Sequence, residues 1–285
     1  MKKKIFSFIQ LILIIIIIYS LYNIASYYYG RYKAGKEFDA YKDLVTDSLD
    51  EMGEEEVAEQ ESPDKAPGKK GEFDIFSIMT REDFKKYKSK YDQVAKQSLD
   101  KFKVKNEDIV SYINIPGMSV KYPMVYKDND FYLRRNLAKE YSWAGSIFIE
   151  ETNKPDFSDM NTVIYGHNMS NSYIKTAEMF DPIIKYEDQG FVDSRKEHFI
   201  DIFTDKGVER YKIFSAYYVD AAADYRTSNM QAQDWTLYLE KLKSRSLADF
   251  GPMDFGEDSK VITLSTCDNV NEDGRFAVHA IRIDI

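Results

Sequence analysis

Residues 261–267 read Val261-Ile262-Thr263-Leu264-Ser265-Thr266-Cys267 and end on the only cysteine of the 285 residues. β-Branched and apolar side chains fill this run, which predicts a buried strand that ends at the sulfur. A second such run, 276–283, begins directly after Arg275. A hairpin through 268–274 would therefore bring a guanidinium back to a thiol that is mounted at the end of a rigid strand.

A third β-type run, 162–165, is followed by Gly166 and His167 and also ends near a titratable group. A thiol, an imidazole and a guanidinium are the nucleophile, the proton carrier and the oxyanion stabiliser of thiol acyl transfer. Structural interpretations of the same residues remain open. A free cysteine is more often a small buried hydrophobe, and a lone histidine is more often a hydrogen-bonded structural residue. An arginine in an acidic loop is often half of a surface ion pair, here with Asp268, Glu272 or Asp273.

Two further histidines compete for the role of base. His279 lies in the middle of the run 276–283, four residues after Arg275, which should keep it away from the mouth of the hairpin. His198 stands among charged neighbours, a setting typical of the surface. The histidines have no H-E-x-x-H spacing and one cysteine cannot complete a structural zinc site, so we expect neither a metal nor another cofactor.

Three lysines at positions 2–4 precede a stretch without charge, Ile5 to Ala25, that is dominated by isoleucine and leucine. At about 1.5 Å per residue, such a helix can cross the ~30 Å hydrocarbon layer. The run is long and lacks a clear small-x-small cleavage site, which favours an uncleaved signal anchor over a cleaved signal peptide. The lysines predict a cytoplasmic N-terminus, although cations between 31 and 36 weaken the asymmetry. Outside the cell a single cysteine cannot pair within the chain, which favours a chemical role for it.

The composition predicts three parts: a cytoplasmic tip and anchor at 1–30, a juxtamembrane helix with an acidic linker at 31–72, and one globular domain at 73–285. Apolar positions with helical spacing predict the juxtamembrane helix from Tyr32 to Met52. The formal charge is −9, and acidic residues concentrate between Asp47 and Asp64, which predicts a solvated linker there. No basic and aromatic pattern points to nucleic acid.

The globular part begins with a predicted helix that Thr80 can cap, with Asp83 as its capping-box partner. Eight β-type runs separated by turn signals follow and predict a mainly β fold, an antiparallel barrel. They are 109–115, 120–126, 146–150, 162–165, 199–203, 211–219, 261–266 and 276–283. A further helix, from Asp234 as N-cap to about Leu247, interrupts the strands before the cysteine strand and is expected to wall the cleft.

Several segments resemble those of class B sortases, membrane-anchored cysteine transpeptidases of Gram-positive bacteria. The segments that carry the family's cysteine, histidine and arginine are matched by Thr263-Leu264-Ser265-Thr266-Cys267, Tyr165-Gly166-His167-Asn168 and Gly274-Arg275-Phe276. Upstream, 113–117, 122–125 and 145–149 are also similar, so the resemblance covers roughly Glu107 to Ile285 in the family's order. It implies an eight-stranded sortase-type barrel with N-terminal helices and an inserted helix before the cysteine strand.

The resemblance also implies a role for each of the three residues. Cys267 as a thiolate would attack a threonine carbonyl in a sorting signal and form a thioacyl-enzyme. His167 would protonate the leaving amine and deprotonate the incoming one, and Arg275 would hold the oxyanion or the substrate backbone. Thiolate and imidazolium are then expected to be minority forms near neutral pH. The residues expected to contact substrate are Ser265, Thr266, Asn168, Tyr165 and Tyr225.

The implied partners are secreted proteins with a C-terminal sorting signal of the N-P-x-T-[NG] or S-P-x-T-G type, and an amine of peptidoglycan or of a pilin. The expected location is the cell membrane, spanned once, with the catalytic domain outside. Two other functions stay open: an extracellular cysteine endopeptidase, which would use water as acceptor, and a non-catalytic wall-associated module, in which Cys267→Ala would leave surface display unchanged. The sequence does not choose the sorting motif, the acceptor amine, wall anchoring or pilus polymerisation, or the oligomeric state.

Overall fold

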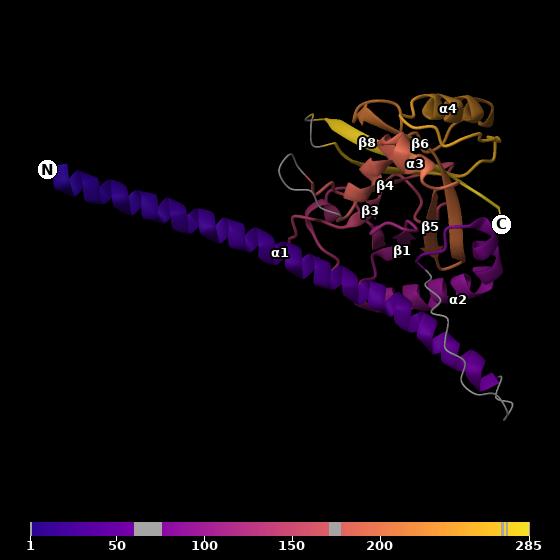
Figure 1. Cartoon of the computed structure of the whole chain (residues 1–285), viewed down its shortest axis with the longest axis horizontal. Coiled ribbons are helices and arrows are strands. Elements are labelled where there is room, and N and C mark those ends of the chain that lie inside the picture. Colours follow the sequence, from indigo (N-terminus) through magenta and orange to yellow (C-terminus); the bar gives the residue numbers. More distant parts are fainter. Residues whose placement is uncertain (1, 60–75, 171–177, 269–270, 272, 285) are drawn as a thin grey trace.

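The computed structural model describes residues 2–59, 76–170, 178–268, 271 and 273–284. Within these ranges eight strands close into a barrel, with longer helices packed around it (Figure 1). The order around the barrel is β1-β2-β3-β4-β7-β8-β6-β5. The strands are β1 (Ile109–Asn114), β2 (Lys121–Tyr126), β3 (Ile147–Ile149), β4 (Asn161–Tyr165), β5 (Phe199–Thr204), β6 (Gly207–Asp220), β7 (Val261–Cys267) and β8 (Gly274–Arg282).

The predicted eight-stranded barrel is confirmed, and every predicted strand overlaps an observed one. The prediction of antiparallel pairing throughout is wrong, because β2 pairs with β3, and β4 with β7, in parallel. The other neighbours are antiparallel. Parallel neighbours need a long crossover connection, here about a third of the chain between β4 and β7. Apolar periodicity identifies a strand but not the direction of a neighbour so distant in sequence.

The helix α2 (Arg81–Lys105) packs across β1, β5 and β6. Its buried face includes Phe84, Tyr91 and Phe102. The Phe102 ring lies 5.7 Å from that of Tyr112 on β1, centroid to centroid. The predicted cap is confirmed, since Thr80 Oγ1 accepts a hydrogen bond from the backbone N–H of Asp83 at 3.0 Å.

We expect Thr80→Ala to lower the free energy of unfolding by about 1 kcal/mol, because it removes the acceptor of a first-turn amide. Thr236→Ala is a matched control within α4 (Ala232–Ser244), where alanine is the better former of a helix interior. Urea unfolding should therefore show a loss for Thr80→Ala alone. Equal losses in the two variants would contradict the capping role.

The helix α1 runs without a break from Lys2 to Glu59 and joins elements that the sequence predicts as separate. It unites the predicted anchor with the juxtamembrane helix and continues into the predicted linker. The segment predicted as a solvated acidic linker is thus helical up to Glu59, and glutamate is a good helix former. The rest of that linker lies outside the described residues. In the described part of the chain, α1 is the one helix long and apolar enough to cross a bilayer.

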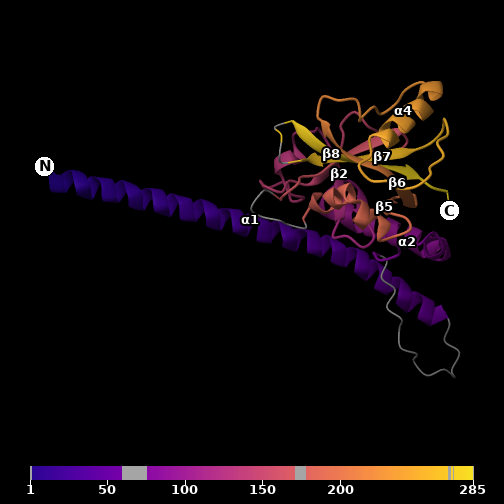
Figure 2. The ribbon, with the colours of Figure 1, turned by 45° about the horizontal axis from the view of Figure 1, so that its top comes forward.

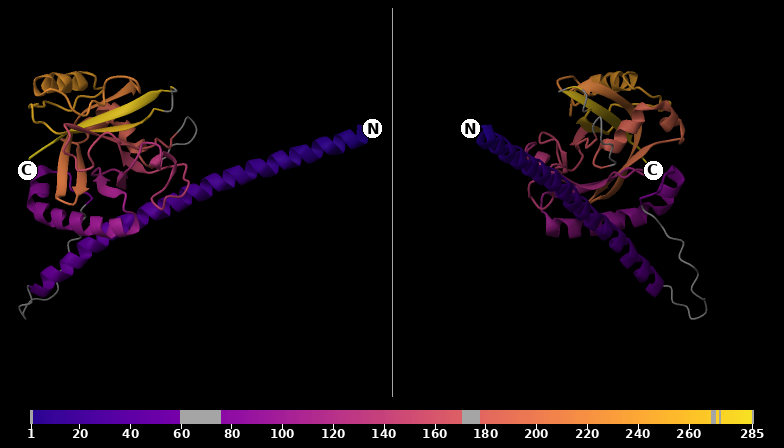
Figure 3. Two further views of the ribbon diagram at one scale, coloured as in Figure 1. Left: turned by 180° about the vertical axis from the view of Figure 1, so that it is seen from behind. Right: turned by 60° about the vertical axis from the view of Figure 1, so that its left-hand side comes forward.

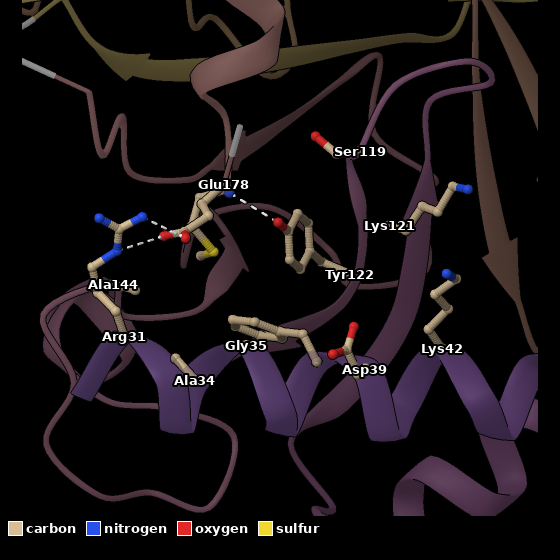
Figure 4. Close-up of a pocket in the computed structure, with 12 residues that line it drawn as sticks. Arg31, Ala34, Gly35, Asp39, Lys42, Ser119, Lys121, Tyr122, Ala144 and Glu178 are labelled. Carbon is tan, nitrogen blue, oxygen red and sulfur yellow. Dashed lines mark hydrogen bonds and ion pairs between the residues drawn. The ribbon is translucent and has the colours of Figure 1, made fainter. Parts of the chain in front are cut away.

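The second half of α1 lies against the barrel and α2 (Figures 1 and 3). Phe38 meets Tyr122 of β2 edge to face at a centroid distance of 4.9 Å, and Tyr41 meets Phe102 in the same way at 5.2 Å. The apolar face predicted for this part of the helix is confirmed. A hollow of about 380 Å³ remains between α1 and the barrel, and at one end of it Arg31 pairs with Glu178 at 2.6 Å (Figure 4). This half of α1 is thus part of the folded domain.

The helix predicted before the cysteine strand is α4, but it begins earlier than predicted. Its N-cap position is Gln231, and Asp234 lies in the first turn, where a carboxylate also suits the helix dipole. Trp235, Leu239 and Leu242 are buried over the barrel on the side away from α1 (Figure 2). The shorter helices are η1 (Tyr132–Arg134), η2 (Asp181–Glu187) and α3 (Gln189–Asp193).

Candidate active site

Cys267 is the last residue of β7 and Arg275 the second residue of β8. The two strands are antiparallel, and these two residues are direct partners in the register. Directly opposite residues of an antiparallel pair project to the same face. The hairpin predicted from the sequence therefore brings the guanidinium to the side of the barrel on which the sulfur lies. Cys267 is a free, partly exposed thiol.

His167 reaches the same end of the barrel through the parallel pairing of β4 with β7. Tyr165 lies opposite Ser265, and Gly166 N donates a hydrogen bond to the Ser265 carbonyl at 3.2 Å. The two chains run in one direction, so His167 and Cys267 both follow two residues later. An antiparallel pairing would have put the histidine at the other end of the cysteine strand. The parallel pair, which the sequence did not predict, is what assembles the site.

The three side chains line one open pocket of about 250 Å³. Its other described lining residues come from β3, β4 and β7, from η1 and from the segments that connect these elements: Asn129, Leu133, Phe148, Glu150, Tyr165, Gly166, Ala221, Arg226, Ser265 and Thr266. Of the described residues that line the pocket, none belongs to α4. The prediction that this helix walls the cleft is therefore wrong, and the chain after β6 takes that place.

The imidazole of His167 is oriented by a backbone group. Its Nε2 lies 2.7 Å from the carbonyl oxygen of Leu133. A carbonyl only accepts, so Nε2 carries a proton and Nδ1 is the nitrogen left to exchange one. Burial lowers the pKa of His167 below its usual range, and the positive charge of Arg134 lowers it further, while the hydrogen bond to Leu133 opposes both. Near neutral pH the imidazole is therefore mostly neutral.

We expect Arg134→Gln to raise the pKa of His167, because it removes a positive charge that opposes protonation of the ring. Arg134→Lys keeps the charge and serves as the control. The measurement is an NMR titration of the imidazole C–H signals, with the other two histidines as internal references. A lower or unchanged pKa of His167 in Arg134→Gln would contradict this account of the site.

The predicted substrate-contacting residues divide into two groups. Ser265, Thr266 and Tyr165 line the pocket, and the buried Thr266 Oγ1 has no hydrogen-bond partner within the described structure. Asn168 instead donates from Nδ2 to the Cys267 carbonyl at 3.1 Å and so fixes the backbone of the cysteine. Tyr225 is fully buried, and its hydroxyl lies 3.0 Å from Ser265 Oγ. The structure thus places Tyr225 behind the pocket wall.

A polar chain along one side of the pocket was not predicted from the sequence. Arg226 donates to the hydroxyl of Tyr165 at 2.8 Å, and that hydroxyl donates to Glu150 at 2.6 Å. Asn129 donates to the other oxygen of Glu150. Burial raises the pKa of Tyr165, and the bond to Glu150 adds to the effect, so the hydroxyl remains a donor. Glu150 directly follows β3. A charged residue at the end of a predicted strand was the sequence feature that could have identified it as a site residue.

The two other histidines, His279 and His198, are both buried in the structure. His279 is fully buried between Thr263 and Tyr217 and does not line the pocket. Burial and the charge of Arg245 lower its pKa to about 3. The expectation that His198 is a surface residue is wrong: it is buried and bonds to the Val192 carbonyl, because three aromatic rings pack around it.

For Arg275 the alternative was an ion pair within its own loop. In the described part of the chain Arg275 forms no ion pair with Asp268 or Asp273, and Glu272 lies outside the described residues. Its hydrogen bond, from Nη1 to the Gly274 carbonyl at 2.9 Å, leaves further donors of the guanidinium for a ligand. Asp268 accepts a hydrogen bond from Asn271 N at 3.0 Å and so caps the turn.

Comparisons with known proteins agree with this geometry. The family model for the sortase domain matches residues 113–283. Sortase B of Listeria monocytogenes is 35% identical over 179 residues, which cover 61% of this chain and 69% of that protein. The structure of Clostridium perfringens sortase B superposes with a TM-score of 0.59 at 29% identity, covering 65% of this chain and 100% of that one. A Staphylococcus aureus sortase B–substrate complex gives a TM-score of 0.61 at 26% identity, with 72% and 91% covered.

Proposed function

Because the chain belongs to the sortase family and within it to class B, we propose that it cleaves a sorting signal after threonine and transfers the threonine carbonyl to an amine. The main support for the proposal is that Cys267, His167 and Arg275 line one pocket. A nucleophile, a proton carrier and an oxyanion donor are the three groups that acyl transfer requires. The substrates are secreted proteins with a C-terminal sorting signal, and the acceptor is an amine of peptidoglycan or of a pilin.

In the first half-reaction the Cys267 thiolate attacks the threonine carbonyl carbon. The peptide C–N bond breaks as His167 gives its Nδ1 proton to the departing amine, which leaves a thioester. In the second half-reaction an amine attacks the thioester, His167 takes the proton of the amine, and the C–S bond breaks. Arg275 donates hydrogen bonds to the oxyanion of both tetrahedral intermediates. The low pKa of His167 supports a working imidazolium that is a minor form at neutral pH.

The pocket wall supplies the remaining contacts with the sorting signal. Ser265, Thr266 and Tyr165 contact the bound peptide, and their place in the pocket lining at the ends of β4 and β7 supports this assignment. Asn168 holds the Cys267 carbonyl in place, and Tyr225 acts through Ser265 from behind the wall. The bound peptide therefore lies along the ends of β4 and β7.

The protein is anchored in the cell membrane by α1, with residues 2–4 in the cytoplasm and the barrel outside. The apolar and unburied first part of α1 supports the anchor, and the three lysines ahead of it support the orientation. This location places the pocket where secreted proteins leave the membrane. It also explains why a single cysteine is kept unpaired outside the cell.

The test is intact-mass spectrometry of the enzyme mixed with peptides that carry N-P-x-T-N, N-P-x-T-G or S-P-x-T-G motifs. We expect a mass increase equal to the acyl fragment that ends in threonine, lost again when triglycine, a diaminopimelate peptide or a lysine peptide is added. The amine-linked product should then accumulate. Hydrolysed peptide alone, with every amine present in excess, would instead identify an endopeptidase.

A further inference from the structure

Two large aromatic side chains are exposed on the loop between η1 and β3. Tyr141 is 66% and Trp143 49% exposed, and their rings meet edge to face at a centroid distance of 5.8 Å. Arg134 stacks on Trp143 and donates to its carbonyl at 2.9 Å. Ser142 N donates to the Arg134 carbonyl, which folds the loop back on itself. The loop therefore holds these rings in solvent, and exposed apolar groups held in this way mark a contact surface.

The same loop is fastened to α1 by two polar contacts. The carboxylate of Glu140 pairs with Lys33, and the backbone N–H of Ala138 donates to Glu37 at 2.8 Å. Figure 4 shows Ala144, at the end of the loop, beside Arg31 at the end of the hollow nearer the N-terminus of α1. Tyr141 thus directly follows Glu140, which pairs with Lys33 of α1.

Lys33 lies at the level of α1 where a headgroup layer would end. The residues from Ile5 to Gly30 carry no charge, and 26 residues of helix measure about 39 Å. A bilayer with its headgroups is about 40–45 Å thick. Exposed tyrosines at positions 28 and 29 occupy the outer end of this stretch, and exposed Tyr32 follows it, at the level where aromatic belts form. Tyr141 and Trp143 are therefore held beside the outer belt of the helix itself.

This surface is continuous with the mouth of the candidate active site. Leu133, the residue before Arg134, is partly exposed, lines the pocket and binds His167 through its carbonyl. Figures 1 and 3 show β8 beginning on the side of the barrel from which α1 extends toward the N-terminus, with the C-terminus on the opposite side. The end of the barrel that carries Arg275 and Cys267 thus faces the same way as the aromatic loop.

We propose that Tyr141 and Trp143 enter the outer headgroup layer and form a second membrane contact, which seats the catalytic end of the barrel on the bilayer. The inference rests on the proposed anchoring by α1. Tyrosine and tryptophan have an apolar ring and a polar tip, which suits this layer. Arg134 lies against the Trp143 ring, Arg135 pairs with Tyr141 through an isolated β-bridge, and arginines suit lipid phosphates. The expected partner is a phospholipid surface that contains anionic headgroups.

The chain has two tryptophans, and their surroundings provide a direct test. Trp143 is exposed, whereas Trp235 is fully buried and donates to the Ser259 carbonyl at 2.9 Å. The full-length protein is reconstituted in phosphatidylcholine and phosphatidylglycerol vesicles with spin labels at the headgroup, at a shallow acyl position or at a deep one. The fluorescence difference between wild type and Trp143→Phe reports Trp143 alone, with the native core intact.

We expect headgroup and shallow labels to quench Trp143 strongly, deep labels to quench it weakly, and Trp235 to be unaffected. Flotation of the same samples on a density gradient checks the anchor. Protein that floats while Trp143 is quenched no more than Trp235 would overturn the inference and leave the anchor intact. Protein that does not float would refute both.

A functional test separates membrane seating from peptide binding. The double variant Tyr141→Ser, Trp143→Ser should react with a soluble sorting peptide at the wild-type rate, and several-fold more slowly with the same peptide tethered to the vesicle. Leu237→Ser is the matched control, since Leu237 is 71% exposed on α4, on the side away from α1, and should alter neither rate. An equal loss with both substrates, or no loss with either, would contradict the proposal.

Discussion

Replacing Cys267 by alanine should abolish formation of the acyl-enzyme and reduce turnover by about 10⁶-fold, the loss typical of an acyl-transfer site without its nucleophile. No other described side chain in the pocket can substitute for the thiol. Ser265 Oγ is engaged with Tyr225, and Thr266 Oγ1 is buried. Intact-mass spectrometry with a sorting peptide should show no adduct, and product analysis should show no transfer to an amine.

The fold should survive this change, because Cys267 is partly exposed at a strand end and forms no disulfide. The melting temperature of Cys267→Ala should therefore stay close to that of the wild type. Thr263→Val is a useful contrast on the same strand: it removes a buried hydroxyl that bonds to Asn161 and His279, away from the pocket, and should affect stability before chemistry. Acyl transfer that persists in Cys267→Ala would refute the assignment of the nucleophile.

Replacing Arg275 by alanine should lower kcat by about 10²–10³-fold, equivalent to roughly 2.7–4 kcal/mol of transition-state stabilisation for an oxyanion donor. Arg275 lies opposite Cys267, and within the described residues its guanidinium donates one hydrogen bond, to the Gly274 carbonyl, which leaves other donors for the reacting carbonyl. Arg275→Lys should recover little, because an ammonium group cannot present two parallel donors in a fixed plane. The measurement is steady-state kinetics that separate kcat from KM.

Arg282→Lys is the matched control for this prediction. Arg282 is the last residue of the same strand, and it forms a partly exposed ion pair with Glu209 at 3.2 Å. Such pairs contribute about 0–1 kcal/mol, so the variant should retain nearly full activity. A loss in Arg275→Ala that falls wholly on KM would show that Arg275 holds the peptide without stabilising the oxyanion.

The strand ends could be predicted because their signals are local. The run 261–267 carries its own β pattern, and the short distance to Arg275 leaves a hairpin as the simplest connection. That prediction placed two of the three chemical groups together, and the register confirms it. The position of His167 beside them was inferred from a family resemblance, since nothing local predicts that β4 runs parallel to β7.

Most of the errors share one physical origin, since they depend on contacts between segments far apart in sequence. His198 has charged neighbours along the chain but aromatic neighbours in space. The polar chain through Glu150 and Arg226 joins residues from two distant loops, and neither residue type is distinctive alone. The start of α4 was missed for a local reason, because aspartate suits both the N-cap position and the first turn of a helix.

Because α1 is continuous, the number of its residues determines the direction in which the barrel faces. A helix turns by about 100° and rises about 1.5 Å with each residue, and α1 has no interruption at which the barrel could swivel. In the proposed membrane-anchored orientation, two residues inserted before Arg31 would rotate the pocket by about 200° around the axis of α1. An insertion of seven residues would return the pocket to nearly its original direction and move it by about 10 Å along the helix axis. The length of this helix therefore sets both the direction in which the pocket faces and its distance from the first residues of α1.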